Sequence, residues 1–369
     1  MSSLAAANQL KVSEVQTIIK GLHAHGKIGE ISVYLSGPPG IGKTALYEQM
    51  AKELDADYEV FLTATMDPTD VSGIPNANGV LTTFLPPERL VNLTGYNKNG
   101  KFTIATFEDL PACNEQVFAA LFRLFHEREV GGYKIRDNVL MCATGNRSGD
   151  RAGAQELPTA LANRFVHYEL GVDSDEWCRW AMLNSIDPIV IAFISQTGGK
   201  QYLHNFNPDS GETCFPSPRS VAKASMLYKI FGDQPNLLMA SLAGCCGENW
   251  ASTFINFAQV KEKLIPVKDI FNDPDNARLP NSKEIDVCLA VISTILCALA
   301  ENPKDFTNFS AAYKYAIRLP HRDLGIRLAH NTSVILQELD EFCAFFSCPI
   351  GKETLIKSQA VFGKYLNLD

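Results

Sequence analysis

The chain has 369 residues, of which 46% are hydrophobic and 20% are charged, a balance typical of folded globular proteins rather than of disordered ones. Its formal net charge of −8 argues against a protein whose main task is to coat DNA or RNA. The length is sufficient for two or three domains, each with a substantial core.

Neither the cysteines nor the apolar runs indicate secretion or a membrane. The ten cysteines include no C-x-x-C pair and lack nearby histidines at zinc-site spacing, which favours buried thiols in a reducing cytosol. No signal-peptide pattern opens the chain. The longest apolar stretch, 288–300, is shorter than the roughly 20 residues that a spanning helix needs, and it predicts a buried helix. We therefore expect a cytoplasmic protein without a membrane partner.

The first elements in the chain surround a glycine-rich loop. A helix is predicted at 11–26, a strand at 31–35 and a further helix at 45–54. Between the last two, the sequence matches G-x-x-x-x-G-K-[ST] in the strand–loop–helix context that this motif requires. Backbone N–H groups of such a loop surround phosphate oxygens, the lysine reaches the β- and γ-phosphates, and the final hydroxyl binds Mg²⁺. The residues predicted to bind ATP are Gly37, Pro38, Pro39, Gly40, Ile41, Gly42, Lys43 and Thr44.

Strands and helices alternate up to residue 172 or so. Further strands are predicted at 57–63, 102–107, 138–143 and 165–170, with a helix at about 114–128. The stretch 66–100 is expected to be a long irregular insertion, and 129–137 a hairpin with a Gly-Gly turn. Alternation of this kind predicts an α/β fold with a parallel sheet flanked by helices. The later pattern is helical, with loops at 198–217 and 271–283. The expected domains are an α/β nucleotide-binding domain at 1–172, a helical lid at 173–235 and a helical C-terminal extension at 236–369.

Two acidic residues follow the strand at 102–107. Glu108 is placed to hold the metal beside Thr44, and Asp109 to orient the attacking water. Because the usual order in such ATPases is Asp then Glu, the reversed order predicts binding of ATP more firmly than fast hydrolysis. At the end of the strand at 138–143, Asn146 is a candidate contact for the γ-phosphate or the water.

Five segments together resemble an AAA+ ATPase, and more narrowly the MoxR group within the dynein-related AAA+ clade. The resemblance covers about residues 15–235, and its motifs are 37–44, Phe107-Glu108-Asp109-Leu110, Ala143-Thr144-Gly145-Asn146-Arg147, 157–165 and Phe215-Pro216-Ser217-Pro218-Arg219-Ser220. It implies that Asn146 is sensor 1, that Arg164 is the arginine finger of a neighbouring subunit's site, and that Arg219 is sensor 2. The alternatives for the trans-acting arginine are Arg123, Arg128, Arg147 and Arg151.

The resemblance also implies a function. MoxR-like proteins form rings, so we expect a homo-oligomer, hexameric in form, that uses ATP and Mg²⁺ to remodel or activate a partner protein, often one with a von Willebrand factor A domain. The insertion at 66–90 and the hairpin at 129–137 would face the pore of the ring, with Tyr133 and Lys134 toward the substrate. Two alternatives stay open: an NTPase motor directed at nucleic acid, which the acidic charge disfavours, and a nucleotide-gated scaffold with weak hydrolysis.

Overall fold

The computed structural model describes residues 9–78, 81–96, 100–150, 155–199 and 201–362. Two compact units make up the chain. The first contains residues 1–172 and 206–211, and the second contains residues 173–205 and 212–369. In the described ranges, no helix combines the length and the apolarity needed to cross a bilayer.

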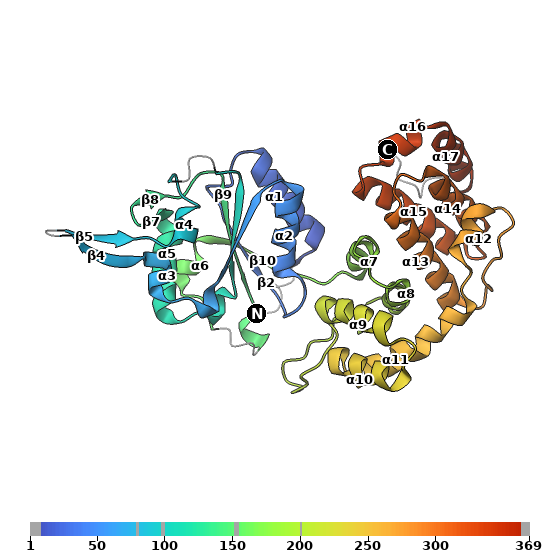
Figure 1. Cartoon of the computed structure of the whole chain (residues 1–369), viewed down its shortest axis with the longest axis horizontal. Coiled ribbons are helices and arrows are strands. Elements are labelled where there is room, and N and C mark those ends of the chain that lie inside the picture. Colours follow the sequence, from blue (N-terminus) through green and yellow to red (C-terminus); the bar gives the residue numbers. More distant parts are fainter. Residues whose placement is uncertain (1–8, 79–80, 97–99, 151–154, 200, 363–369) are drawn as a thin grey trace. The chain divides into compact units, whose positions relative to one another are not determined.

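The first unit is built on a six-stranded parallel sheet with the strand order β1-β10-β2-β9-β6-β3 (Figure 1). The predicted α/β fold with a parallel sheet is therefore confirmed. The two-residue strand β1 is too short to produce a periodic pattern, and it was not predicted. The strands are β1 (Gln9–Leu10), β2 (Ser32–Ser36), β3 (Asp57–Leu62), β6 (Thr103–Glu108), β9 (Val139–Gly145) and β10 (Phe165–Leu170).

Alternate residues of each strand pack into two separate cores, one on each face of the sheet. In β2, Val33 and Leu35 lie in the core beneath α1 and α2, whereas Tyr34 lies in the core beneath α5. Figure 1 shows these helices on opposite faces of the sheet. The helices of this unit are α1 (Val12–Ala24), α2 (Lys43–Glu53), α3 (Pro68–Ser72), α4 (Glu88–Val91), α5 (Glu115–Glu127) and α6 (Thr159–Ala162).

The stretch 66–100 is more regular than expected. It contains α3, the antiparallel hairpin β4 (Ile74–Asn78) and β5 (Leu81–Leu85), and α4, so the prediction of an irregular insertion was wrong. The hairpin extends away from the sheet (Figure 1). Because such a hairpin has no buried face to impose a strong alternation of apolar residues, its strands are weakly marked in the sequence. The hairpin predicted at 129–137 is confirmed as β7 (Glu129–Val130) and β8 (Tyr133–Lys134).

The second unit is helical, as the sequence predicted for this part of the chain. At its centre, α13 contains the apolar stretch 288–300 and packs on α7, α8 and α15, which confirms a buried helix there. The helices are α7 (Ser174–Leu183), α8 (Pro188–Thr197), α9 (Pro218–Phe231), α10 (Pro235–Cys246), α11 (Glu248–Ala258), α12 (Val267–Asn272), α13 (Ile285–Glu301), α14 (Phe306–Arg318), α15 (Arg322–Glu338), α16 (Phe342–Ser347) and α17 (Pro349–Phe362).

Candidate nucleotide site

The glycine-rich loop joins the carboxyl end of β2 to the start of α2. Gly37, Gly40 and Gly42 have φ values of 153°, 79° and 100°, a region that residues with a side chain rarely adopt. A Cβ atom on Gly37 would lie only 2.7 Å from Ile41 Cδ1 and 3.0 Å from the carbonyl oxygen of Leu170. The loop therefore needs glycine both for its backbone conformation and for its close packing.

Lys43 is buried at the first position of α2, and its ammonium group is held by oxygen atoms. Its Nζ donates hydrogen bonds to the carbonyl oxygens of Gly37 at 2.7 Å and Pro38 at 3.0 Å, and to Oδ1 of Asn146 at 2.9 Å. Asn146 follows β9, the strand beside β2. The structure thus brings together two predicted site residues that lie 103 positions apart in the chain.

The two acidic residues at the end of β6 have different surroundings. Glu108 shares a sheet face with Ile104, which lies in the same core as the apolar side of α2. Its carbonyl oxygen accepts a hydrogen bond of 2.6 Å from Thr63 Oγ1, which fixes the end of β6 against the end of β3. Asp109 has a φ of 50° and begins a 3₁₀ turn at 110–112. Because the left-handed conformation turns Asp109 out of the strand, the alternation of side chains along β6 does not indicate on which face of the sheet its carboxylate lies.

Two tyrosines that the sequence did not reveal, the half-buried Tyr58 and the buried Tyr34, lie near these acids. Burial raises the pKa of Tyr58 to about 12, a hydrogen bond with the Thr106 side chain acts to lower it, and the negative charge of Glu108 adds a smaller rise. Burial also raises the pKa of Tyr34 well above its usual range, with a smaller contribution from the charge of Asp109. Both hydroxyls therefore stay protonated at neutral pH. In the sequence, each tyrosine looks like an ordinary strand residue, and only the register of the sheet brings it to the site.

Arg164 lies at the amino-terminal end of the parallel strands, whereas the phosphate loop follows the carboxyl end of β2. It immediately precedes β10, whose first residue, Phe165, pairs with Ser32 at the start of β2. Its guanidinium carbon lies 5.4 Å from the ring centre of Phe122 on α5, and among the described residues its buried Nε has no hydrogen-bond partner. A side chain in this position cannot reach the phosphate loop of its own chain.

The alternative arginines have structural partners within the first unit. Arg147 pairs with Asp150 at 3.0 Å and with Glu169 at 3.1 Å. The exposed Arg123 pairs with Glu127 one turn along α5, and Arg128 donates to the carbonyl oxygens of Arg136 and Val139. Arg151 lies outside the described residues.

Arg219 belongs to the second unit, where it is exposed in the first turn of α9. The hydroxyls of Ser217 and Ser220 cap this helix reciprocally, with Ser217 Oγ accepting from the backbone N–H of Ser220 at 3.2 Å. The cap fixes where α9 begins and therefore from which turn Arg219 projects.

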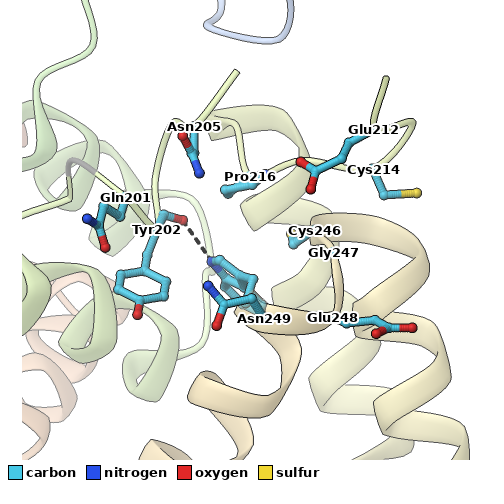
Figure 2. Close-up of a pocket in the computed structure, with 11 residues that line it drawn as sticks. Gln201, Tyr202, Asn205, Glu212, Cys214, Pro216, Cys246, Gly247, Glu248 and Asn249 are labelled. Carbon is cyan, nitrogen blue, oxygen red and sulfur yellow. Dashed lines mark hydrogen bonds between the residues drawn. The ribbon is translucent and has the colours of Figure 1, made fainter. Parts of the chain in front are cut away.

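The second unit also contains a small polar pocket of about 140 Å³. Figure 2 shows Tyr202 among the residues that line it. The carbonyl oxygen of Tyr202 accepts a hydrogen bond of 2.7 Å from the indole N–H of Trp250. Glu212 and Glu248 are among its lining residues, and none of the predicted site residues lines it.

The residues at the edge of the sheet fit ATP and Mg²⁺ by their chemistry. The loop presents glycine backbone and a helix N-terminus to an anion, and Lys43 supplies a fixed positive charge. The Thr44 hydroxyl and the Glu108 carboxylate are hard oxygen ligands of the kind that Mg²⁺ prefers. Gly37–Thr44 would hold the triphosphate, with Thr44 and Glu108 on the metal.

The strand order, the phosphate loop and a polar residue at the end of the adjacent strand are features of a P-loop domain. Residues 32–165 match the family model described as the AAA domain of the dynein-related subfamily. This match covers β2, β3, β6 and β9, the loop and the acidic residues, and it supports an AAA+ fold for this segment.

Among solved structures, the chain is similar to RuvB of Thermotoga maritima. One mutant form is 15% identical, covers 66% of this chain and 68% of its own, and has a TM-score of 0.38. A form titled as a Holliday junction branch migration motor is 12% identical, with coverages of 72% and 75% and a TM-score of 0.35. No curated protein sequence matches the chain. These TM-scores are too low to indicate a shared function.

Proposed function

We propose that this protein binds and hydrolyses MgATP and uses the cycle to remodel or activate a partner protein. The observation that carries the proposal is the position of Lys43, whose Nζ is held between two loop carbonyls and Asn146 Oδ1. The γ-phosphate of ATP would replace some of these oxygen partners. Nucleotide binding would then be sensed directly at Asn146, the residue in the sensor 1 position.

The proposal gives each acid one role. Glu108 contributes to the Mg²⁺ site because it shares the sheet face on which α2 packs, and Asp109 orients the water. ATP bound at the loop would present its γ-phosphate at the carboxyl edge of β2, β6 and β9. Asp is one methylene shorter than Glu, and an error of about 1 Å can cost about 100-fold in rate, so hydrolysis is expected to be slow.

The position of Arg164 supports ring assembly. Since this side chain lies one strand length from the phosphate loop of its own chain, it can serve as an arginine finger only for a neighbouring subunit. A homo-oligomeric ring, hexameric as in the group that the motifs resemble, would complete each site. In the same scheme 173–235 acts as a lid that carries Arg219 to the nucleotide, and 236–369 is an extension.

The finer part of the proposal concerns the partner. The motifs that resemble the MoxR group favour a cytoplasmic remodelling role with a protein that contains a von Willebrand factor A domain. Capture with an Asp109→Asn variant, which should hold ATP without hydrolysing it, would test this role. Enrichment of such a protein in the presence of ATP supports the proposal, whereas ATP-dependent capture of nucleic acid alone contradicts it.

The binding step is tested with two lysines of the same helix. Lys43→Ala removes the cation inside the loop and should abolish tight ATP binding in calorimetry. Lys52→Ala is the matched control, because Lys52 is exposed near the end of α2, where it pairs with Glu48 at 2.7 Å. Equal ATP affinity in the wild type and Lys43→Ala would refute the proposed site, whereas equal losses in both variants would indicate a nonspecific effect on α2.

A further inference from the structure

Tyr58 of β3 contacts Thr44, one of the two predicted parts of the metal site. Its hydroxyl donates a hydrogen bond to the carbonyl oxygen of Thr44 at 3.4 Å. Tyr58 pairs with Ile104 of β6, and Glu108 lies four residues further along that strand, so all three side chains share one sheet face. One tyrosine therefore connects the start of α2 to the strand that ends in Glu108.

A second polar group lies on the same face. Thr106 pairs with Val60, two residues beyond the Tyr58 pair, and its side chain is fully buried. The Thr106 hydroxyl interacts with the Tyr58 hydroxyl. Tyr58 therefore meets β6 two residues before Glu108 as well as the start of α2, at the margin of the apolar core that contains Ile104.

We propose that Tyr58 is a positioning residue for Mg²⁺ bound with ATP: its hydroxyl holds the backbone of Thr44 at a fixed spacing from Glu108. The inference rests on the proposed function of this site. Mg²⁺ demands near-octahedral geometry with oxygen ligands at about 2.0–2.1 Å, and it tolerates errors in ligand spacing poorly. Glu at the first acidic position has one more rotatable bond than the usual Asp, which increases the need for a fixed partner across the metal.

The test compares Tyr58→Phe with Tyr34→Phe, each of which removes one hydroxyl and keeps the ring. Tyr34 is the matched control because it is a buried tyrosine of the same sheet on the opposite face, near Asp109. ATP affinity is measured in EDTA and across a Mg²⁺ titration, with thermal unfolding of each variant. For Tyr58→Phe we expect unchanged affinity in EDTA and a Mg²⁺ midpoint raised about 3- to 10-fold, the effect of one lost hydrogen bond. For Tyr34→Phe the Mg²⁺ midpoint should stay at the wild-type value.

Three outcomes would overturn the inference. One is an unmoved Mg²⁺ midpoint in Tyr58→Phe, and another is an equal shift in both variants. The third is a loss of ATP affinity in EDTA as large as the loss in Mg²⁺, which would indicate a merely structural role. If Tyr58→Phe does not fold, Thr106→Val removes the neighbouring hydroxyl and should raise the midpoint in the same direction. Absence of ATP binding by the wild type under all conditions would instead refute the proposed function itself.

Discussion

The Arg164→Ala variant tests whether the active site is completed by a neighbouring subunit or by a single chain. Phe165 at the start of β10 pairs with Ser32, and Glu169 pairs with Ser36, the last residue of β2 before the phosphate loop. The start of β10 therefore lies four residues away from the loop, measured along the strands. At about 3.3 Å per residue, that separation is roughly 13 Å along the sheet, and Arg164 precedes β10 by one more residue. Its guanidinium is directed to Phe122 instead. Loss of this side chain should therefore leave ATP binding intact.

The expected effect on hydrolysis is large, and the expected effect on folding is small. An arginine finger is worth about 10³–10⁵ in rate, so the variant should lose nearly all turnover at saturating ATP. Its contact with the Phe122 ring is worth about 0.5–1 kcal/mol, which predicts only a modest drop in the unfolding temperature. Arg123→Ala is the comparison variant, because Arg123 is an alternative for the trans-acting arginine that lies exposed on α5 next to Phe122 and pairs only with Glu127 among the ion pairs of the described residues.

Phosphate release is measured over a range of protein concentrations and after mixing Arg164→Ala with Lys43→Ala subunits. Specific activity of the wild type should rise with concentration, because dilution dissociates the ring. Each site needs one intact loop and one intact finger across a head-to-tail interface, so a random equal mixture should restore about one site in four. Mixed rings without any recovered activity would refute the trans role of Arg164. Undiminished activity of a proven monomer would refute the ring.

Two further substitutions test the geometry of the acids and of the sheet edge. Exchange of the two acids, Glu108→Asp with Asp109→Glu, should raise turnover, because the longer side chain at position 109 would reach the attacking water. It should also lower the unfolding temperature slightly, because Asp tolerates a φ of 50° better than Glu. A slower double variant in single-turnover assays would show that the site is adapted to the reversed order. Gly145→Ala would place a Cβ 2.2 Å from the Tyr34 hydroxyl and should lower the free energy of unfolding by about 1–3 kcal/mol in urea titrations. Gly149→Ala is its control, since a Cβ there meets nothing within 4 Å, and equal losses in both variants would contradict the packing argument.

Much of the first unit was predictable because its residues carry local signals. The strands at 57–63, 102–107, 138–143 and 165–170 were recognised to within two residues, because each is a short segment rich in apolar and β-branched residues. The phosphate loop was recognisable because its glycines, lysine and threonine are adjacent in the chain. The hairpin β4–β5 was missed because its strands project from the sheet and need no regular apolar pattern. The two-residue β1 gives no pattern at all.

The sequence by itself predicted the class of the domain and indicated the loop, the acids and Asn146 as site residues, since each of these features is a short segment with its own residue pattern. Only the tertiary structure decided which groups meet. The register of β3 on β6 places Tyr58 beside Ile104, on the sheet face of Glu108 and within reach of Thr44, and the parallel pairing of β10 with β2 moves Arg164 away from its own phosphate loop. These relations depend on backbone hydrogen bonds between strands that are distant in the chain. Such pairings leave no mark in a local pattern, because a shift in register by two residues would preserve every alternation of apolar side chains.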